Sequence, residues 1–272
     1  MKASGIVTLT TDFGLSDPYV GAMKGVMLAI NPKATCVDIS HLVKAGAVAQ
    51  ASAILLEAYS FFPPGTVHLV VVDPGVGSKR RPLVIVTPEH LFVGPDNGLF
   101  WPIVETSPRA KAFQLCETGF FLDKVSQTFH GRDIFAPVAA HLSLGMDPKR
   151  MGPPVQDLVP LTPSKPVETE DTLYGHVVRI DHFGNLITDI AIKDLEAFLR
   201  GNLCQIKVGE MTVKGLRKTY SDVTRGEGLA LTGSSGLLEV AVNSGRASEQ
   251  VGLPKDRIIG SVVEVRRTRE AG

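Results

Sequence analysis

The first half of the chain alternates between short apolar runs and longer segments whose apolar residues recur at helical spacing. The runs Gly5–Thr11, Thr35–Ile39 and Val67–Val72 are rich in β-branched residues and predict strands. The segments Val20–Ile30 and Ala45–Phe62 predict helices. This alternation predicts an α/β N-terminal domain with a mainly parallel sheet flanked by helices.

The second half has short strand-like segments separated by glycine-bearing turns, with one brief helix predicted at Lys193–Leu199. The predicted strands are Leu173–Ile180, Leu186–Ile192, Gln205–Val208, Met211–Val213, Gly228–Leu231, Leu237–Val242 and Ser261–Val265. We therefore expect a smaller all-β, barrel-like C-terminal domain. A proline-rich stretch with little periodicity separates the two patterns and predicts a linker at 153–171, between domains 1–152 and 172–272.

Composition and charge indicate which kinds of molecule the protein binds. The 272 residues carry a formal net charge of +0 and no long basic run, which argues against nucleic acid and favours a small-molecule substrate. The sequence has no apolar run long enough to span a bilayer and no signal-peptide pattern at its start, so a cytoplasmic protein is expected. The 3 cysteines are far apart and give no metal-ligand spacing, so no metal is expected.

Two predicted strands of the first half end at an acid. Asp73 follows Val67–Val72 and precedes a glycine-bearing turn with Arg80 close behind, and Asp12 follows the first strand. Open α/β folds bind ligands at the carboxyl ends of their strands. An ionised Asp12 accepts hydrogen bonds only and can take both hydroxyls of a ribose. Alternatively, the residues after Asp73 form a plain β-turn with solvated basic side chains.

Charged residues also gather where helices are predicted to begin. Asp17 precedes a proline and is a candidate N-cap. His130 stands two residues before Arg132 and three before Asp133, a carboxylate that is favourable at a helix N-terminus by charge alone. A lone histidine is commonly structural, but Asp73, Arg80 and His130 together could orient and polarise a water molecule.

Three loops of the second half are unusually polar, namely Asp181–Asn185, Gly233–Gly236 and Asn243–Arg246. In the simpler interpretation each is a hairpin turn, which is favoured for Gly233–Gly236 taken by itself. Read functionally, an aromatic ring, an amide and a carboxylate describe a site for a nucleoside that carries an amino acid. Sequence patterning alone does not choose between these interpretations.

These motifs together resemble the S-adenosyl-L-methionine hydrolases that form adenosine, which are relatives of the fluorinase and chlorinase enzymes. The resemblance runs in order from about Ile6 to Val265. Its motifs are Thr10–Gly14 with Asp17–Gly21, Val72–Gly77 with Arg80, Gly94–Gly98, Phe129–Asp133, Asp181–Asn185 and Ser235–Glu239.

The resemblance implies an N-terminal α/β domain, a C-terminal β-barrel and a homotrimer whose sites lie between the N-terminal domain of one subunit and the C-terminal domain of the next. Asp73, Arg80 and His130 match the family's water-activating triad. The implied substrate contacts are Asp12 to the ribose hydroxyls, Asp17 to the methionine moiety, Asp181 and Ser234 to its amino-acid group, Phe183 and Asn185 to the adenine, and Glu239 as a further substrate-binding residue.

The implied reaction is attack of water or hydroxide on the ribose C5′ carbon with methionine as the leaving group. Because a sulfonium leaves readily, no metal or cofactor is expected. Arg80, always charged, would hold Asp73 and lower the cost of forming hydroxide, while Asp73 and His130 can accept the water's hydrogens. The residues do not decide which group takes the proton.

Two differences from the fluorinase concern the site of the nucleophile. That enzyme has a serine at the halide position, where this chain has His130 followed by Gly131, and a tyrosine at the position of Asp73. A carboxylate beside the nucleophile would repel a halide by roughly a few kcal/mol, so water is favoured. Gly131 alone does not exclude chloride, because the chlorinase resembles this chain there. Ser235 stands where the halogenase has an arginine, which leaves the contacts to the methionine carboxylate open.

Three alternatives remain. The first is a halide adenosyltransferase, against which Asp73 and Arg80 argue. The second is a non-catalytic protein that binds adenosine or S-adenosylmethionine, which would not need a triad for handling a nucleophile. The third, a dinucleotide-binding domain, is the weakest, because Gly75–Gly77 is not followed by a third glycine at the usual place.

Overall fold

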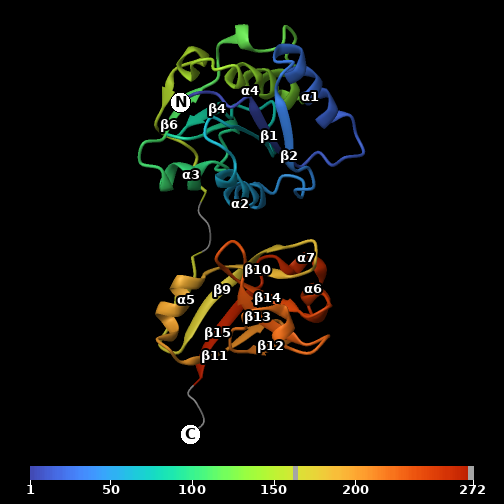
Figure 1. The fold of residues 1–272 in the computed structure, drawn as a ribbon, viewed down its shortest axis with the longest axis vertical. Helices are drawn as coiled ribbons and strands as arrows, with labels where there is room; N and C mark the ends of the chain where they lie inside the picture. Colours follow the sequence, from blue (N-terminus) through green and yellow to red (C-terminus); the bar gives the residue numbers. More distant parts are fainter. Residues whose placement is uncertain (162–164, 269–272) are drawn as a thin grey trace. The chain divides into compact units, whose positions relative to one another are not determined.

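A computed structural model describes residues 1–161 and 165–268 of the chain. The chain divides into two compact units, Met1–Thr162 and Pro163–Gly272 (Figure 1). Each unit has its own sheet and its own buried core.

The first unit is built on a seven-stranded sheet in the order β2-β1-β3-β5-β4-β6-β7. Its strands are β1 (Ile6–Thr11), β2 (Thr35–Ser40), β3 (Val67–Val71), β4 (Pro82–Val86), β5 (Leu91–Pro95), β6 (Lys111–Gln114) and β7 (Pro154–Val155). The pairs among β2, β1, β3 and β5 are parallel, and those among β5, β4, β6 and β7 are antiparallel. The predicted α/β class is confirmed, with a mixed sheet, because the short connection 87–90 permits only a hairpin between β4 and β5.

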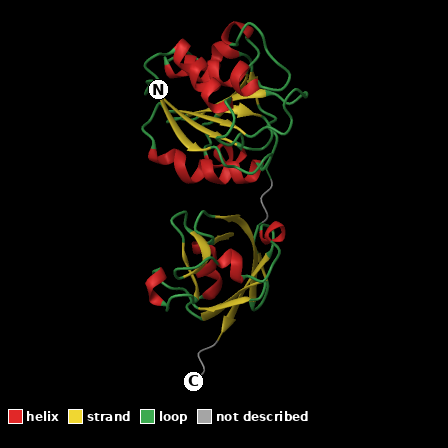
Figure 2. Cartoon of the chain, turned by 90° about the vertical axis from the view of Figure 1, so that its right-hand side faces the viewer, coloured by secondary structure: helices red, strands yellow, loops and turns green. Residues whose placement is uncertain are grey.

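Helices cover both faces of this sheet (Figures 1 and 2). The α-helices are α1 (Tyr19–Ile30), α2 (Val48–Ala58), α3 (Trp101–Thr106) and α4 (Ala136–Ser143), and the shorter turns are Tyr59–Phe61, Thr118–Phe120, Gly131–Phe135 and Pro148–Met151. Met23 of α1 and α4 residues such as Val138 share one core with Leu69, whereas Leu55 of α2 shares the other with Val70. Because both of its faces meet helices, β3 is buried along its whole length, as its continuous apolar run predicts. Within the described part of the chain, no helix has the length and apolar character needed to cross a membrane.

At the start of α1 the structure differs from the prediction that Asp17 is the N-cap. Pro18 occupies the N-cap position, and no side chain makes a capping hydrogen bond there. Asp17 is exposed, and among the described residues it accepts only from the Ser16 hydroxyl, at 3.5 Å. Asp17 is therefore not a helix cap, and its carboxylate is available to a ligand.

The proline-rich stretch contributes a short strand to each unit. β7 adds Pro154–Val155 to the edge of the first sheet beside β6, and β8 (Val167–Glu168) pairs with β9 in the second unit. Between them, the amide of Val159 donates to Asp96 at 3.0 Å. These contacts satisfy part of the backbone of the stretch in spite of its low periodicity.

The second unit is an eight-stranded antiparallel sheet with the path β12-β11-β15-β9-β10-β14-β13, and β8 lies beside β9. Its longer strands are β9 (Thr172–Ile180), β10 (Leu186–Ala191), β11 (Leu203–Val208), β12 (Met211–Lys214), β13 (Gly228–Thr232), β14 (Leu237–Val242) and β15 (Val262–Thr268). A bridge between Arg217, just after β12, and Leu231 of β13 nearly closes the sheet on itself. The predicted barrel-like class is confirmed.

Helical segments complete the second unit. The predicted helix at 193–199 is α5 (Ile192–Leu199), whose Leu195 and Phe198 lie in the barrel core. Three shorter segments follow, namely Tyr220–Asp222, α6 (Ala247–Gln250) and α7 (Lys255–Ile258). The first of these begins with Tyr220, whose hydroxyl contacts Glu239 of β14.

Candidate active site

Asp12 and Asp73 leave the first sheet at the same edge. Thr11, the last residue of β1, pairs in parallel register with Val71, the last residue of β3. The backbone amide of Gly46 donates to Asp12 Oδ2 at 2.8 Å, and a Cβ placed on this glycine would lie 3.6 Å from the proline that follows Asp73. The predicted placement of both acids at the carboxyl ends of neighbouring strands is thus observed.

Asp73, Arg80 and His130 form one hydrogen-bonded cluster. Arg80 Nε lies 3.0 and 2.9 Å from the two carboxylate oxygens of Asp73, and Arg80 Nη2 lies 2.5 Å from Oδ2. The same Nη2 lies 2.7 Å from Nδ1 of His130. The side chains of Arg80 and Asp73 are 9% and 5% exposed, so solvent screens this ion pair weakly.

The cluster fixes the protonation of His130. A guanidinium only donates hydrogen bonds, so Nδ1 of His130 must accept and its proton sits on Nε2. Burial, followed by the nearby Arg80 charge, lowers the pKa of His130 from 6.5. At neutral pH the ring is therefore neutral, with an N–H donor on the nitrogen that does not face Arg80.

A π-helical turn carries His130 into α4. Residues Gly131–Phe135 form this turn, and the amide of Ala136 bonds to the carbonyl of Gly131. Asp133 is fully buried within the turn and accepts from the Ser126 amide at 2.8 Å and from Arg132 Nε at 2.6 Å. Asp133 is therefore a structural anchor, which leaves His130 as the residue of this motif that reaches the cluster. π-turns are frequent at functional sites.

A second network supports the loop that carries Asp12. The Thr11 hydroxyl lies 2.9 Å from Nδ1 of His41, and Nε2 of His41 lies 3.0 Å from Asp38. Asp38 in turn accepts from Lys24 at 2.6 Å. His41 is only 4% exposed, so these contacts tie the end of β1 to the residues after β2 inside the fold.

Aromatic rings lie beside this edge of the sheet. Phe13, Tyr19 and Phe129 pack against one another with ring centroids 5.1 to 5.8 Å apart. A Cβ at Gly131 would lie 3.3 Å from Phe129 and 3.4 Å from Phe13, which is a tight contact. The rings therefore close the space around the residue after His130.

The second unit contains a separate group of predicted site residues. A hollow of about 540 Å³ is lined by His182, Phe183, Asn185, Tyr220, Val242, Ser244, Gly245 and Arg246. Phe183 is 71% exposed and presents its ring to this hollow, whereas Asn185 is 5% exposed. An exposed ring beside a buried amide suits a flat heteroaromatic ligand.

Hydrogen bonds connect Asn185 to two carboxylates. Asp181 accepts from the backbone amide of Asn185 at 2.8 Å and from its side-chain Nδ2 at 2.9 Å. Nδ2 also lies 3.4 Å from the Tyr220 hydroxyl, which donates to Glu239 at 2.6 Å. Glu239, predicted as a substrate contact, therefore holds Tyr220 in the structure. Burial and the bond to Glu239 raise the pKa of Tyr220 to about 12.

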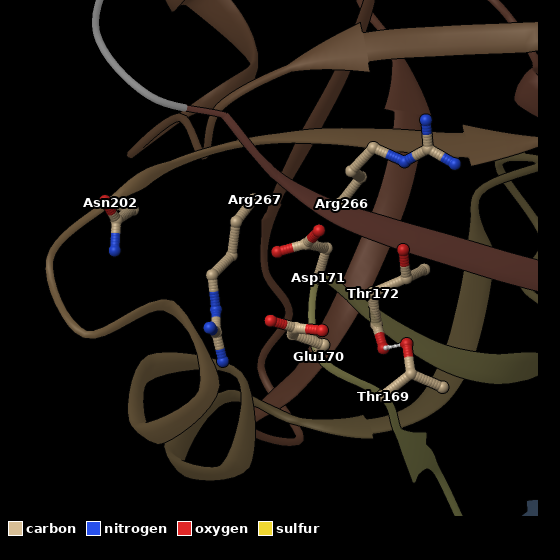
Figure 3. Close-up of a pocket in the computed structure, with 7 residues that line it drawn as sticks. All are labelled: Thr169, Glu170, Asp171, Thr172, Asn202, Arg266 and Arg267. Carbon is tan, nitrogen blue, oxygen red and sulfur yellow. Dashed lines mark hydrogen bonds between the residues drawn. The ribbon is translucent and has the colours of Figure 1, made fainter.

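Ser234 lies apart from this group. It is exposed on the turn between β13 and β14 and is not one of the residues lining the hollow. A larger hollow of about 860 Å³, near the start of β9 and the end of β15, is lined by Thr169, Glu170, Asp171, Thr172, Asn202, Arg266 and Arg267 (Figure 3). It contains none of the predicted site residues. Size alone therefore does not mark the site.

Tyr220 is the main residue that the sequence did not reveal. It begins the short helical segment Tyr220–Asp222, whose sequence shows no apolar period or motif, and only the fold brings it beside Glu239 and Asn185. His41 was missed for the same reason, because its partners Thr11 and Asp38 lie on two different strands. A buried tyrosine hydroxyl requires a partner, which is a signal that only tertiary structure supplies.

Comparison with known proteins gives concordant matches. Models of the SAM hydroxide adenosyltransferase N-terminal and C-terminal domains match residues 7–152 and 175–259. An (R)-S-adenosyl-L-methionine hydrolase of Thermus thermophilus is 40% identical, over 91% of this chain and 95% of the hydrolase. A fluorinase of an Actinoplanes species is 27% identical, over 90% of this chain and 93% of the fluorinase.

A solved structure agrees with the sequence matches. The crystal structure of an uncharacterized conserved protein from Thermotoga maritima superposes with a TM-score of 0.89 at 38% identity, covering 96% of this chain and all of that one. Both the sequence matches and the structural match therefore span the two units.

Proposed function

The chain belongs to the SAM hydroxide adenosyltransferase family, and on that premise we propose that it hydrolyses S-adenosyl-L-methionine to adenosine and L-methionine. Relatives named (R)-S-adenosyl-L-methionine hydrolase are 36 to 40% identical to it, whereas fluorinases are more distant at 25 to 27%. A hydrolase is accordingly favoured over a halide adenosyltransferase.

One observation carries this proposal, the cluster of Asp73, Arg80 and His130. A protein that only bound the substrate would need ribose and base contacts but not a carboxylate, a guanidinium and a partly buried imidazole joined by bonds of 2.5 to 3.0 Å. Such a cluster can hold one water molecule in a defined orientation. We assign that role to it.

In the proposed step, the water oxygen forms a bond to the ribose C5′ carbon as the C5′–sulfur bond breaks. The bonding electron pair stays on sulfur, which becomes the neutral thioether of methionine. Asp73 is the proton acceptor in this proposal, because the free lone pair of His130 faces Arg80. Both oxygens of Asp73 accept from Arg80, yet each carboxylate oxygen has a further acceptor position for the water. His130 donates from Nε2 to the water oxygen and orients it.

The substrate contacts are proposed from the resemblance together with exposure and bonding. Asp12 would bind the ribose hydroxyls, and Asp17, free of any capping bond, would face the methionine moiety. In the second unit, Phe183 would stack on the adenine beside Asn185. Asp181 and Ser234 would contact the amino-acid group, and Glu239 would act through Tyr220.

Following the resemblance, we also propose a homotrimer in which the first unit of one subunit and the second unit of the next complete each site. Light scattering tests the mass. Mixing two impaired variants, Asp73→Asn and Phe183→Ala, should raise activity above that of either alone, because some sites would then combine two intact halves. No recovery after subunit exchange would contradict the shared site.

We further propose that no metal or cofactor takes part, because a sulfonium needs no acid to leave. Turnover should survive treatment with a chelator, and a loss that added metal restores would contradict this proposal. A cytoplasmic location stays a prediction from the sequence, and fractionation of cells that produce the protein tests it.

The experiment that tests the function is incubation of the purified protein with S-adenosyl-L-methionine in water enriched in oxygen-18. Both sulfonium configurations should be supplied, because the hydrolase relatives are named for the R form. We expect adenosine with the label in its 5′-hydroxyl, together with methionine. A label found elsewhere, or no product, would contradict attack of water at C5′.

A parallel incubation with chloride separates the alternatives. The Asp73 carboxylate beside the nucleophile should keep a halide out, so adenosine should remain the product. Formation of a 5′-chlorinated nucleoside would instead identify the protein as a halide adenosyltransferase. Tight binding without any product would support a non-catalytic binding protein.

A further inference from the structure

The hollow beside Phe183 presents mostly apolar surface to a ligand. Phe183 and Val242 give it apolar walls, and Asn185 is its buried amide. In a mostly apolar pocket, a few fixed polar groups decide orientation and specificity. The ligand therefore meets either an acceptor or a donor, depending on whether the oxygen or the NH₂ group of the Asn185 amide faces it.

Asp181 fixes one end of that amide. An ionised carboxylate only accepts hydrogen bonds, so the atom 2.9 Å from Asp181 Oδ2 must be the NH₂ group of Asn185. The second carboxylate oxygen holds the backbone amide of the same residue at 2.8 Å. A rotated amide would place two oxygens against each other at this distance.

Tyr220 engages the same NH₂ group from another side. The single hydroxyl hydrogen of Tyr220 is donated to Glu239 at 2.6 Å, so the phenol oxygen can only accept from Asn185. The contact to Nδ2 is longer, at 3.4 Å, and supplements the bond to Asp181. The direction of each bond in the series Asp181, Asn185, Tyr220, Glu239 is thus set by the carboxylates at its two ends.

Both hydrogens of the Asn185 amide are engaged, whereas none of the described residues, 1–161 and 165–268, donates a hydrogen bond to its Oδ1. We propose that Asp181 and Tyr220 are positioning residues that keep Oδ1 of Asn185 facing the ligand, so that the site accepts a base with an exocyclic amino group and rejects its 6-oxo counterpart. The inference rests on the proposed function and extends it to the choice of base.

The chemistry of the two bases supports this selectivity. The 6-amino group of adenine donates a hydrogen that Oδ1 can accept. Hypoxanthine presents a carbonyl oxygen at the same place, which would leave two acceptors facing each other in a buried site. Sites that pair a specific polar group discriminate strongly, because the wrong ligand leaves that group unpaired.

The test compares kcat/KM for S-adenosyl-L-methionine and S-inosyl-L-methionine, which share the ribose, sulfonium and methionine. We expect the wild type to prefer the adenosyl compound by at least about tenfold. Asp181→Asn removes the obligate acceptor and lets the amide rotate, so the preference should fall at least about fivefold. Tyr220→Phe keeps the ring, removes the hydroxyl and should lower the preference less. The double variant should lower it most.

Phe183→Leu is the matched control. It weakens stacking on both bases alike, so it should lower both kcat/KM values and leave their ratio unchanged. A loss of amino-acid contacts at Asp181 would likewise affect both substrates equally. The ratio therefore isolates the orientation of the amide.

Two results would overturn the inference while hydrolysis stands: a wild type that uses both substrates equally, or Asp181→Asn and Tyr220→Phe variants that are folded and keep the full preference. If neither substrate is turned over, the proposed function fails instead. In that case calorimetry of the full chain with adenosine and inosine decides the inference, since tighter adenosine binding supports it and equal binding overturns it.

Discussion

Nη2 of Arg80 lies 2.7 Å from Nδ1 of His130. This contact assigns different tasks to two residues that the sequence alone left interchangeable. His130 presents only a donor to the water, while Asp73 retains acceptor positions. Variants of Asp73 and His130 should therefore fail in different ways.

Replacing Asp73 should remove the proton acceptor. We expect Asp73→Asn to lower turnover at least about tenfold with a small change in substrate affinity. Because free hydroxide bypasses a missing base, the residual rate should rise with pH by about tenfold per unit, unlike that of the wild type. Steady-state kinetics over a pH series measures both effects, and thermal melts check that the variant is folded. Full turnover in Asp73→Asn would exclude the proposed role.

Replacing His130 should remove the orienting donor. We expect His130→Ala to bind substrate nearly as well as the wild type and to turn it over at least about tenfold more slowly. In contrast to Asp73→Asn, its slow rate should not be rescued by raising the pH. Calorimetry and single-turnover measurements separate binding from chemistry. Recovery at high pH would assign the base to His130 instead.

The lowered pKa of His130 predicts the acid side of the pH profile. Protonation would place a second N–H on Nδ1, against Arg80, so the neutral ring is the active form. Because burial and Arg80 lower the pKa below 6.5, kcat/KM should stay level as the pH falls through 6.5 and decline only at lower pH. A decline centred at or above 6.5 would contradict this assignment.

Asp12 should contribute to binding rather than to chemistry. We expect Asp12→Ala to raise the dissociation constant of the substrate by an amount equivalent to about 1.5–3 kcal/mol, because a charged acceptor for the ribose hydroxyls is lost. Titration in an Asp73→Asn background avoids turnover. The loop itself is held by Thr11 and His41 as well, so it should persist. Unchanged affinity would remove Asp12 from the ribose site.

His68 should make the first unit sensitive to acid. It is fully buried on β3, its Nδ1 lies 2.8 Å from the Thr8 hydroxyl, and burial together with His90 lowers its pKa to about 3. Between about 3 and 6.5 the unfolded chain binds a proton that the folded chain does not. The free energy of unfolding should therefore fall as the pH falls through this window, by at most about 1.4 kcal/mol per pH unit.

Urea unfolding at several pH values measures this slope. His68→Leu removes the titrating group and should flatten the dependence, although it leaves the Thr8 hydroxyl without its partner and lowers stability at neutral pH. Parallel slopes in the two proteins would show that other groups cause the sensitivity.

The elements of the fold were largely predictable because their signals are local. The strand over 67–72 and the helix over 20–30 follow from apolar period and from proline and glycine boundaries, and the structure has them at Val67–Val71 and Tyr19–Ile30. The orientation of β4 does not follow from its apolar run, although the short connection 87–90 indicates a hairpin with β5. A strand buried on both faces has the same apolar pattern whether its neighbours are parallel or antiparallel.

The residues of the candidate site likewise differ in whether local sequence signals reveal them. Asp12 and Asp73 are visible in the sequence because acids at strand ends stand out against apolar runs. The partnership of Asp181 with Asn185 arises within one turn, yet its extension to Tyr220 and Glu239 spans separate strands and loops. The capping interpretation of Asp17 failed because Pro18 took the N-cap position itself.

The π-turn Gly131–Phe135 holds one more residue per hydrogen-bonded loop than an α-helical turn does. Deleting one residue there would produce a regular helix. The residues just before the turn would then be rotated by about 100° relative to α4. His130 would then swing away from Arg80 with every side chain of the cluster still present. The geometry of the proposed catalytic cluster thus depends on the number of backbone units in this turn as well as on the identity of three side chains. Deleting a single residue of the turn should therefore abolish activity without changing any of the three.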